Sequence, residues 1–474
     1  MKKIILLFIL TIFIIGCAEK QIEQPEKEQA TETPQQETPQ EVITETAEEQ
    51  VNVSETTTQE GTPMPAEEKA PEETQTDWPT FHGDLARTGF SASKAPSKPN
   101  VLWKWVIGDF IKIGYDESFD ENWPIIAGNN AFFAAGNIFA FELKTGKLVW
   151  RYSDEGNFYP RGLAAGDGKL FVSVNTDDDY ESSNFNFPPG FIYALDEKTG
   201  NFLWKYQTQK GIPYSLPLFA DGKVFVGDNS GNVYAIGAAN GGLIWKKYLE
   251  GAAVIHSSPA YDDGIIFIGT EDSIGASSKP SHLYALDAET GEVIWKFAID
   301  VVGGKLNLVH STPAILDDIV YFGAENGYFY ALNSKDGSLV WKQKIASGSG
   351  EIVGTSAAAA LGYGKVFIGT FEGKFLALDK DDGKTVWEYT FGKTEADSSP
   401  VVADGKVYFG AGKGDFYSFD AATGKVIWKE KLGGLSAALA DGILIVRNAR
   451  IEDEPEPQTP VIIAFSDEGK LSLW

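Results

Sequence analysis

The stretch Ala194-Leu195-Asp196-Glu197-Lys198-Thr199-Gly200-Asn201-Phe202-Leu203-Trp204 carries the pattern that decides the fold. Copies that keep the same spacing of Ala, Gly and Trp recur along the chain. They occupy residues 140–150, 235–245, 285–295, 331–341, 377–387 and 418–428, the last with Ser in place of Ala. A weaker copy at 464–474 has its Gly469 one place early. Such recurrence indicates a repeat architecture, in which each unit is one supersecondary element.

The units have the length and internal pattern of propeller blades. Their tryptophans are separated by 41 to 54 residues. In one unit the Asp221-Gly222 pair precedes an alternating run at 223–227, and a second run follows at 232–236. Alternation with β-branched and aromatic residues predicts short antiparallel strands joined by tight hairpins. Four strands per unit, repeated eight times, predict an all-β, eight-bladed β-propeller of four-stranded antiparallel blades.

A tryptophan at a fixed place on each outermost strand has a structural explanation. Its ring can cover the flank of the neighbouring blade and bury a large apolar area. Its indole N–H then needs an acceptor, which a backbone carbonyl of that blade could supply. We therefore expect nine docking tryptophans: Trp103, Trp150, Trp204, Trp245, Trp295, Trp341, Trp387, Trp428 and Trp474.

The repeated Ala-x-Asp-x-x-x-Gly-x-x-x-Trp pattern resembles the tryptophan-docking motif of PQQ-like eight-bladed propellers. Residues 77–89, Asp-Trp-Pro-Thr-Phe-His-Gly-Asp-Leu-Ala-Arg-Thr-Gly, resemble the segment that opens the propeller in that family. The resemblance covers residues 77–474 and implies that an N-terminal strand completes the last blade. The strand around Trp103 is the favoured candidate, and residues 471–474 are the alternative.

The N-terminus carries a targeting pattern. Lys2 and Lys3 precede an apolar run at 4–15, which is too short to span a bilayer and has the length of a signal-peptide core. Gly16-Cys17 at its end resembles the lipobox of secreted lipoproteins. This resemblance implies a lipoprotein signal peptide over 1–17, with Cys17 as the lipidated mature N-terminus. An ordinary signal peptide with an incidental cysteine is the alternative.

Residues 18–76 form a predicted tether between this anchor and the propeller at 77–474. The segment contains sixteen Glu, three Lys and neither Asp nor Arg, so its net charge is −13. It is rich in Glu, Thr, Pro and Gln and has too few large apolar residues to build a core, which predicts disorder. The whole chain has a net charge of −27. Nucleic acid is therefore excluded as an expected partner, because phosphate binding requires a basic surface.

The resemblance also bears on enzymatic activity. It implies that dehydrogenases with this fold hold their quinone beneath a disulfide between adjacent cysteines, together with a calcium ion. This chain has one cysteine, which falls in the targeting region. We therefore expect no enzymatic activity, no cofactor and no resident metal. A PQQ-dependent dehydrogenase remains a remote alternative.

Candidate binding residues are few. His256 and His310 occupy the same place in successive units, just before Ser-Ser-Pro and Ser-Thr-Pro. Because the innermost strands of a propeller surround its axis, the equivalent polar residues could form a ring that binds a metal or polar ligand. These channel-lining candidates are Glu121, Tyr214, His256, His310, Thr355 and Asp397. No ligand-spacing motif accompanies them, so hydrogen-bonded structural residues are the favoured interpretation.

Two functions follow from these observations. The first is a membrane-anchored, extracytoplasmic scaffold for protein partners in the cell envelope, as the resemblance to BamB-type lipoproteins implies. The second is an extracytoplasmic propeller that binds a peptide, glycan or small polar molecule. A diderm host would place the chain at the outer membrane or in the periplasm, and an archaeon or monoderm host at the cell surface. We expect a monomeric propeller.

Overall fold

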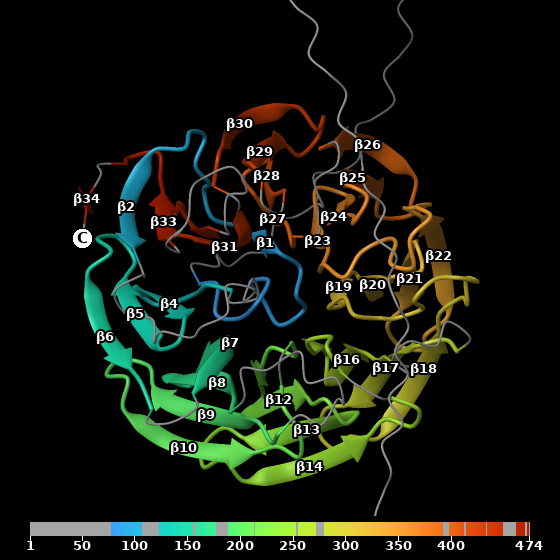
Figure 1. Cartoon of the computed structure of the whole chain (residues 1–474), viewed down its shortest axis with the longest axis horizontal. Helices are drawn as coiled ribbons and strands as arrows, with labels where there is room; N and C mark the ends of the chain where they lie inside the picture. The colour runs from blue at the N-terminus through green and yellow to red at the C-terminus, as the bar shows by residue number, and fades with distance from the viewer. Residues whose placement is uncertain are drawn as a thin grey trace, which may run out of the picture. The chain divides into compact units, whose positions relative to one another are not determined.

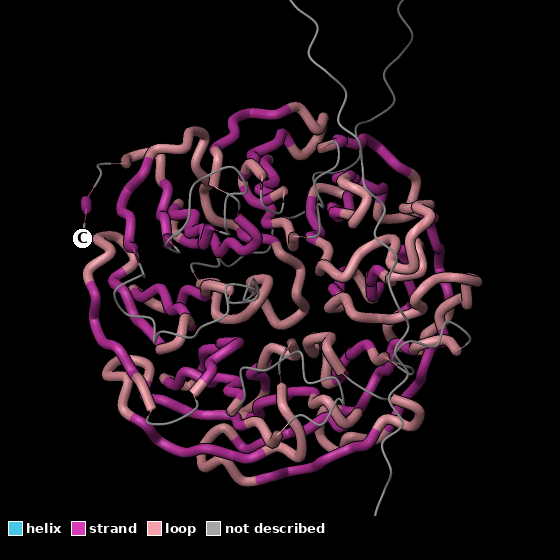
Figure 2. The backbone as a smooth tube through the Cα atoms, viewed as in Figure 1, coloured by secondary structure: helices cyan, strands magenta, loops and turns pink. Residues whose placement is uncertain are grey.

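The structure, a computed structural model, describes residues 77–106, 123–154, 158–176, 188–212, 214–252, 255–271, 279–391, 398–411, 414–432, 434–448, 461–469 and 472–473. All of them belong to the unit Glu68–Trp474. They form strands and loops without a helix, arranged in eight sheets around a ring (Figure 1, Figure 2). This confirms the predicted all-β, eight-bladed propeller. No helix in this part of the chain is long and apolar enough to cross a membrane.

In blades 1 to 7 the four blade strands pair antiparallel and run outward from the axis in chain order, whereas blade 8 adds an N-terminal and a C-terminal strand outside its first three. Blade 1 consists of β3 (Ile125–Ala127), β4 (Asn130–Ala134), β5 (Ile138–Glu142) and β6 (Leu148–Tyr152), and blade 2 of β7 (Tyr159–Gly166), β8 (Lys169–Asn175), β9 (Phe191–Asp196) and β10 (Phe202–Gln207). Blade 3 consists of β11 (Leu218–Ala220), β12 (Lys223–Gly227), β13 (Asn232–Gly237) and β14 (Leu243–Tyr248), and blade 4 of β15 (Ala260–Asp262), β16 (Ile265–Gly269), β17 (His282–Asp287) and β18 (Val293–Ala298). Blade 5 consists of β19 (Ala314–Leu316), β20 (Ile319–Gly323), β21 (Tyr328–Asn333) and β22 (Leu339–Lys344), and blade 6 of β23 (Ala360–Gly362), β24 (Lys365–Gly369), β25 (Lys374–Asp379) and β26 (Thr385–Thr390). Blade 7 consists of β27 (Val401–Ala403), β28 (Lys406–Gly410), β29 (Phe416–Asp420) and β30 (Val426–Glu430), with β1 (Phe90–Ser91) added inside β27. Blade 8 consists of β31 (Gly434–Ala440), β32 (Ile443–Asn448), β33 (Val461–Phe465), β2 (Val101–Val106) and β34 (Ser472–Leu473).

The turn residues explain the hairpins. Asp221 and Gly222 have φ angles of 47° and 70°, and Asp404 and Gly405 have 50° and 72°. Two successive positive φ values match the right-handed twist of the flanking strands, which is why Asp-Gly pairs occupy such turns. The middle strands of each blade are buried on both faces between neighbouring blades. Their near-continuous apolar sequences follow from that position.

The ring is closed by the N-terminal strand. β2 pairs antiparallel with β33, with Trp103 opposite Ala464 and Lys104 opposite Ile463. In Figure 1 the blue β2 lies beside the red β33. The favoured expectation is therefore confirmed: the strand of Trp103 is the fourth strand of blade 8. The C-terminal β34 adds outside β2 and runs parallel to it, so strands from the two sides of the propeller sequence belong to the same sheet.

The docking tryptophans connect each blade to the next. In seven of them the indole N–H donates to a backbone carbonyl of the following blade, at 2.8 to 3.2 Å. The donors are Trp103, Trp150, Trp204, Trp245, Trp295, Trp341 and Trp387, and the acceptors are Leu143, Glu197, Ala238, Ala288, Ser334, Lys380 and Ala421. The glycine of each turn lies beneath the ring, as at Gly291, where a Cβ would come within 2.7 Å of Trp245.

Residues 78–93, which we call the inner strap, pass around the axis and bond to all eight blades (Figure 1). The backbone of Trp78 exchanges two hydrogen bonds with Ile126 of blade 1. One residue of each of blades 2 to 8 also hydrogen-bonds to the strap. In blade order, these pairs are Ala165 with Pro79, Pro217 with Arg87, Tyr261 with Leu85, Ile315 with Ala86, Leu361 with Thr88, Val402 with Gly89 and Gly442 with Ser93. The strap therefore satisfies backbone groups on the inner strands that no further strand covers.

Two buried side chains of the inner strap, those of Arg87 and His82, connect it to the blades. The guanidinium of Arg87 is fully buried and donates to the carbonyls of Pro217 and Pro259 at 3.2 and 3.0 Å. The imidazole of His82 lies between the carbonyls of Arg87 and Pro400, at 2.8 Å from each. Blades 3, 4 and 7 are thereby connected to one segment.

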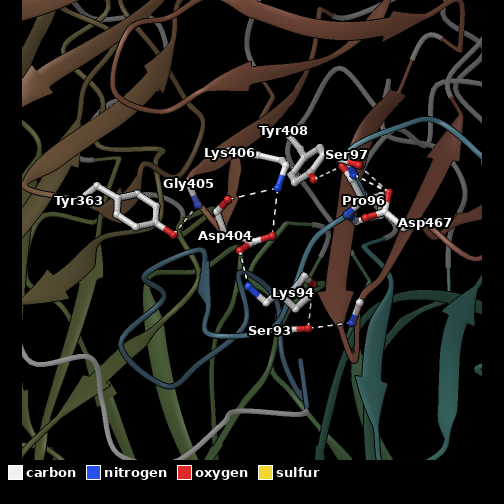
Figure 3. A network of polar contacts seen from close by, with 11 residues as sticks. Ser93, Lys94, Pro96, Ser97, Tyr363, Asp404, Gly405, Lys406, Tyr408 and Asp467 are labelled. Carbon is white, nitrogen blue, oxygen red and sulfur yellow. Dashed lines mark hydrogen bonds and ion pairs between the residues drawn. The ribbon is translucent and has the colours of Figure 1, made fainter.

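Beyond the strap, the chain is bonded to blades 7 and 8 before it enters β2 (Figure 3). Lys94 Nζ lies 3.1 Å from Asp404 Oδ1, and the Tyr408 hydroxyl donates to the Pro96 carbonyl at 2.7 Å. The Ser97 N–H donates to Asp467 at 2.8 Å. These contacts direct the chain from the axis to the rim.

Candidate functional site

Three of the predicted channel-lining residues come together. Tyr214, His256 and His310 lie just before the inner strands of blades 3, 4 and 5, at equivalent places in the repeat. The ring centroids of Tyr214 and His256 are 4.5 Å apart, those of His256 and His310 4.8 Å, and those of Tyr214 and His310 5.7 Å. Successive blades therefore bring residues that are far apart in the sequence into one aromatic group.

Two glutamates that were not among the expected channel-lining residues complete this group. Glu271 and Glu325 each lie two residues beyond the glycine that ends the second strand of blade 4 or blade 5. Each also follows its histidine by 15 residues, as 256 to 271 and 310 to 325. Antiparallel pairing of β15 with β16 brings the start of the first strand to the end of the second. The repeated His-to-Glu interval was thus a usable signal in the sequence.

We call Tyr214, His256, Glu271, His310 and Glu325 the inner polar cluster. His256 Nδ1 lies 2.7 Å from Glu271 Oε1, and His310 Nδ1 lies 3.7 Å from the same oxygen. His310 Nδ1 is also 3.2 Å from Glu325 Oε1. Both carboxylates are at least nine-tenths buried, with side-chain exposures of 5% and 6%.

The cluster is electrostatically coupled but incompletely hydrogen-bonded. Burial raises the pKa of Glu271, but the facing imidazoles of His256 and His310 lower it more, so that the pKa lies below its ordinary value. The short contact between His256 and Glu271 lacks the angles of a hydrogen bond. Both ring nitrogens of His256 and Oε1 of Glu271 consequently have no hydrogen-bond partner among the described residues. Buried polar atoms of this kind are costly and require an explanation.

Of the remaining predicted channel residues, the structure describes Thr355. Thr355 is fully buried and its hydroxyl accepts from the backbone N–H of Ala357 at 3.1 Å, which is a local structural role. Glu121 and Asp397 lie outside the described residues, as do Cys17 and Trp474. Trp428 faces blade 8, with its ring 6.1 Å from that of Phe465, but its indole N–H has no acceptor in the part of the chain that the structure describes.

An eight-bladed ring whose blades dock through tryptophans defines the class of this protein as a PQQ-like repeat propeller. The sequence profile of one family, described as outer membrane protein assembly factor BamB, matches residues 189–352 and 258–454. These matches cover more than half of the chain. The chain belongs to this family.

Individual relatives have diverse names. Tetrathionate hydrolase of Acidithiobacillus ferrooxidans is 26% identical over 42% of this chain and 41% of its own length. The assembly factor BamB of Yersinia pestis is 28% identical over 48% of this chain and 57% of its own length. The chain thus matches about half of the length of these relatives. Their names include both an enzyme and an assembly factor, so the expected absence of enzymatic activity stays a prediction.

Solved structures show the same fold. A quinohemoprotein alcohol dehydrogenase from Pseudomonas putida HK5 superposes with a TM-score of 0.67 at 16% identity, over 84% of this chain and 81% of that chain. BamB from Moraxella catarrhalis gives a TM-score of 0.56 at 16% identity, over 77% of this chain and 97% of that chain. At this identity the likeness establishes the architecture alone.

Proposed function

We propose that this chain is a lipid-anchored, extracytoplasmic propeller that acts as a non-catalytic scaffold for protein assembly in the cell envelope. The observation that carries the proposal is the match of more than half of the chain to a family described as an outer membrane assembly factor. The predicted lipid anchor at Cys17 and the acidic tether agree with an envelope location. The single cysteine of the chain also argues against the adjacent-cysteine site that the resemblance associates with quinone-dependent enzymes.

The scaffold proposal is tested by gentle detergent extraction of the full-length chain from native membranes. We expect a defined complex with an envelope protein, which native mass spectrometry or crosslinking identifies. A chain that ends at residue 76 and keeps only the predicted anchor and tether is the matched control, and it should retain no partner. A monomeric propeller recovered from native membranes under the same conditions would contradict the proposal.

The anchor is tested separately. In the Cys17→Ser variant we expect loss of acylation and release from the membrane fraction, because a single lipid-modified cysteine is the proposed attachment. Mass spectrometry of the mature N-terminus reports the acyl chains directly. Unchanged membrane retention with no acyl mass on the native chain would contradict lipid anchoring and leave the scaffold role to be judged by the first experiment.

A second function, ligand binding by the propeller, is favoured by the inner polar cluster. Its buried, incompletely hydrogen-bonded His256 and Glu271 are unusual for residues with a purely structural role. A ligand that binds only the folded chain raises its melting temperature. The test is a screen of peptides, glycans and small polar molecules. A compound that raises the melting temperature of the native chain but not that of the His256→Ala variant would support this function.

A further inference from the structure

The inner polar cluster contains more buried charge than its own hydrogen bonds explain. Glu271 and Glu325 are both at least nine-tenths buried, and the side chain of His256 is 10% exposed. A buried carboxylate is tolerated where it is paired with a cation or coordinates a metal. Protonation of both histidines would supply two positive charges. A divalent cation would supply the same charge while the imidazoles stay neutral.

The positions of the donor atoms favour the second arrangement. One ligand atom from each of His256, Glu271 and His310 can be chosen so that all three lie within 4.8 Å of one another. Tetrahedral zinc with bonds of about 2.0–2.2 Å holds neighbouring ligand atoms roughly 3.3–3.6 Å apart. Glu271 Oε1 lies 2.7 Å from His256 Nδ1, which is shorter than a ligand separation, and the His310 ring lies beside the same oxygen, with its Nδ1 at 3.7 Å. Side-chain adjustments of about 1 Å would therefore form the site.

The second observation is the lack of hydrogen-bond geometry at the donor atoms themselves. His256 has no hydrogen bond on either ring nitrogen within the described part of the chain, and neither does Glu271 Oε1. A hydrogen-bonded structural histidine would have at least one of these contacts satisfied. Donors that face one another at short distance without hydrogen-bond geometry are arranged as ligands around a common point.

Glu325 has a different place in this arrangement. It lies 3.2 Å from His310 Nδ1, and it accepts a hydrogen bond when that nitrogen carries the proton. In that tautomer Nε2 is unprotonated, and its lone pair can bind a metal. Histidine ligands commonly donate their other N–H to a carboxylate, which orients the ring and increases its basicity. Glu325 is therefore a positioning residue.

We propose that His256, Glu271 and His310 form a binding site for a divalent transition-metal ion of the zinc class, next to the inner strands of blades 4 and 5. Two imidazoles and one carboxylate suit such ions, and three protein ligands leave a coordination position open. The site is independent of the scaffold role: it predicts direct metal binding whether or not a partner protein is present.

The test uses the full-length chain, purified without a polyhistidine tag and treated with a chelator. Titration with Co²⁺ should give the visible absorption of a four-coordinate site at one equivalent, and Zn²⁺ should abolish it by displacement. The His256→Ala and Glu271→Gln variants should lose this signal. Glu325→Gln should weaken Zn²⁺ binding by about 10- to 100-fold, as expected for a carboxylate that orients a ligand. His282→Ala, which changes a histidine outside the cluster, is the matched control and should bind as the native chain does.

Thermal unfolding distinguishes a ligand from a structural role. In the absence of metal, Glu271→Gln should melt at or above the native temperature, because it removes a buried charge. With Zn²⁺ present, only the native chain and the His282→Ala control should gain stability. The proposal is overturned if the native chain takes up no stoichiometric metal, or if Glu271→Gln binds as tightly as the native chain. Metal-independent destabilisation by Glu271→Gln would instead identify Glu271 as the partner of a protonated His256.

Discussion

One buried donor distinguishes Trp428 from the other docking tryptophans whose side chains the structure describes. Trp295 and Trp428 are equally buried, at 9% exposure, and each covers the flank of the next blade, Trp295 over Gly337 and Trp428 beside Phe465. Trp295 donates to the Ser334 carbonyl at 2.8 Å, whereas the indole N–H of Trp428 has no acceptor in the described chain. The equivalent carbonyl in the eighth copy is that of Asp467, which accepts from the side-chain amide of Asn100 at 3.3 Å.

This difference predicts unequal effects of the same substitution. Trp295→Phe loses ring area and a buried hydrogen bond, whereas Trp428→Phe loses similar area and removes an unsatisfied donor. We expect the first variant to lower the free energy of unfolding by about 1–2 kcal/mol more than the second. Urea unfolding followed by circular dichroism measures both. Equal losses would show that the indole hydrogen bond contributes nothing to docking.

His82 makes stability depend on pH. Burial lowers its pKa from 6.5 to about 4, and nearby Arg87 adds to this effect, while the two facing carbonyls oppose it. The folded-state pKa is lower than the unfolded one, so the neutral residue contributes its full stability above pH 6.5. This contribution, on the order of 3 kcal/mol, is lost as the pH falls from 6.5 towards 4, where only the unfolded chain takes up the proton.

The His82→Gln variant isolates that contribution. Urea midpoints measured at pH 7.5 and 4.5 should differ less in the variant than in the native chain. Other acidic groups titrate in both proteins, and their effect cancels in the comparison. The same pH dependence in the two proteins would contradict the lowered pKa.

At the scale of the blade, the turn before the outermost strand packs against the docking tryptophan of the preceding blade. Gly264 and Gly291 both have positive φ, of 79° and 73°. A Cβ on Gly264 would meet nothing within 4 Å, whereas one on Gly291 would come within 2.7 Å of the Trp245 ring. The two glycines thus share a backbone requirement and differ in their surroundings.

The pair separates backbone strain from docking. Gly264→Ala should cost about 1 kcal/mol, because alanine is strained at positive φ. Gly291→Ala should cost several times more, since it also displaces a buried tryptophan. Thermal melts of the two variants test this difference, and indole fluorescence reports whether Trp245 moves. Equal melting temperatures would show that the ring rearranges without cost.

The repeat predicted the blades because each is a local structure. Asp-Gly turns, alternating strands and the tryptophan all lie within one unit, so the sequence contains their geometry. The cluster of His256, Glu271 and His310 joins residues from different units, and the placement of their side chains depends on how neighbouring blades pack. The sequence identified the equivalent histidines and contains the repeated interval to each glutamate, but the burial of Glu271 and its contacts with both histidines depend on the pairing of β15 with β16 and on the packing of blades 4 and 5.

At the scale of the molecule, closure depends on segments at the N-terminal side of the first blade. The strap bonds to all eight blades and β2 pairs with β33. A chain that begins at residue 107 loses both, and leaves the edge of β33 unpaired. Unpaired edges associate with other chains, so we expect this truncation to melt at a lower temperature and to form oligomers.

A chain that begins at residue 77 is the control for this truncation. It lacks only the predicted signal peptide and tether. Its melting temperature should equal that of the full-length chain, because those residues contribute nothing to the predicted core. Light scattering and thermal melts measure both truncations. A monomeric 107–474 chain with the melting temperature of the 77–474 chain would contradict the closing role of the strap and β2.

The strap also imposes an order of events on folding. Its partners lie far along the chain, with separations of 172 residues between Arg87 and Pro259, 318 between His82 and Pro400, and 349 between Ser93 and Gly442. At about 5–20 residues per second, the ribosome needs roughly 17–70 s to make the last of these after the first. Contacts of such long range form slowly. The first part of the ring to be synthesised is therefore the last to be fixed, and until then its apolar residues are available to chaperones and proteases.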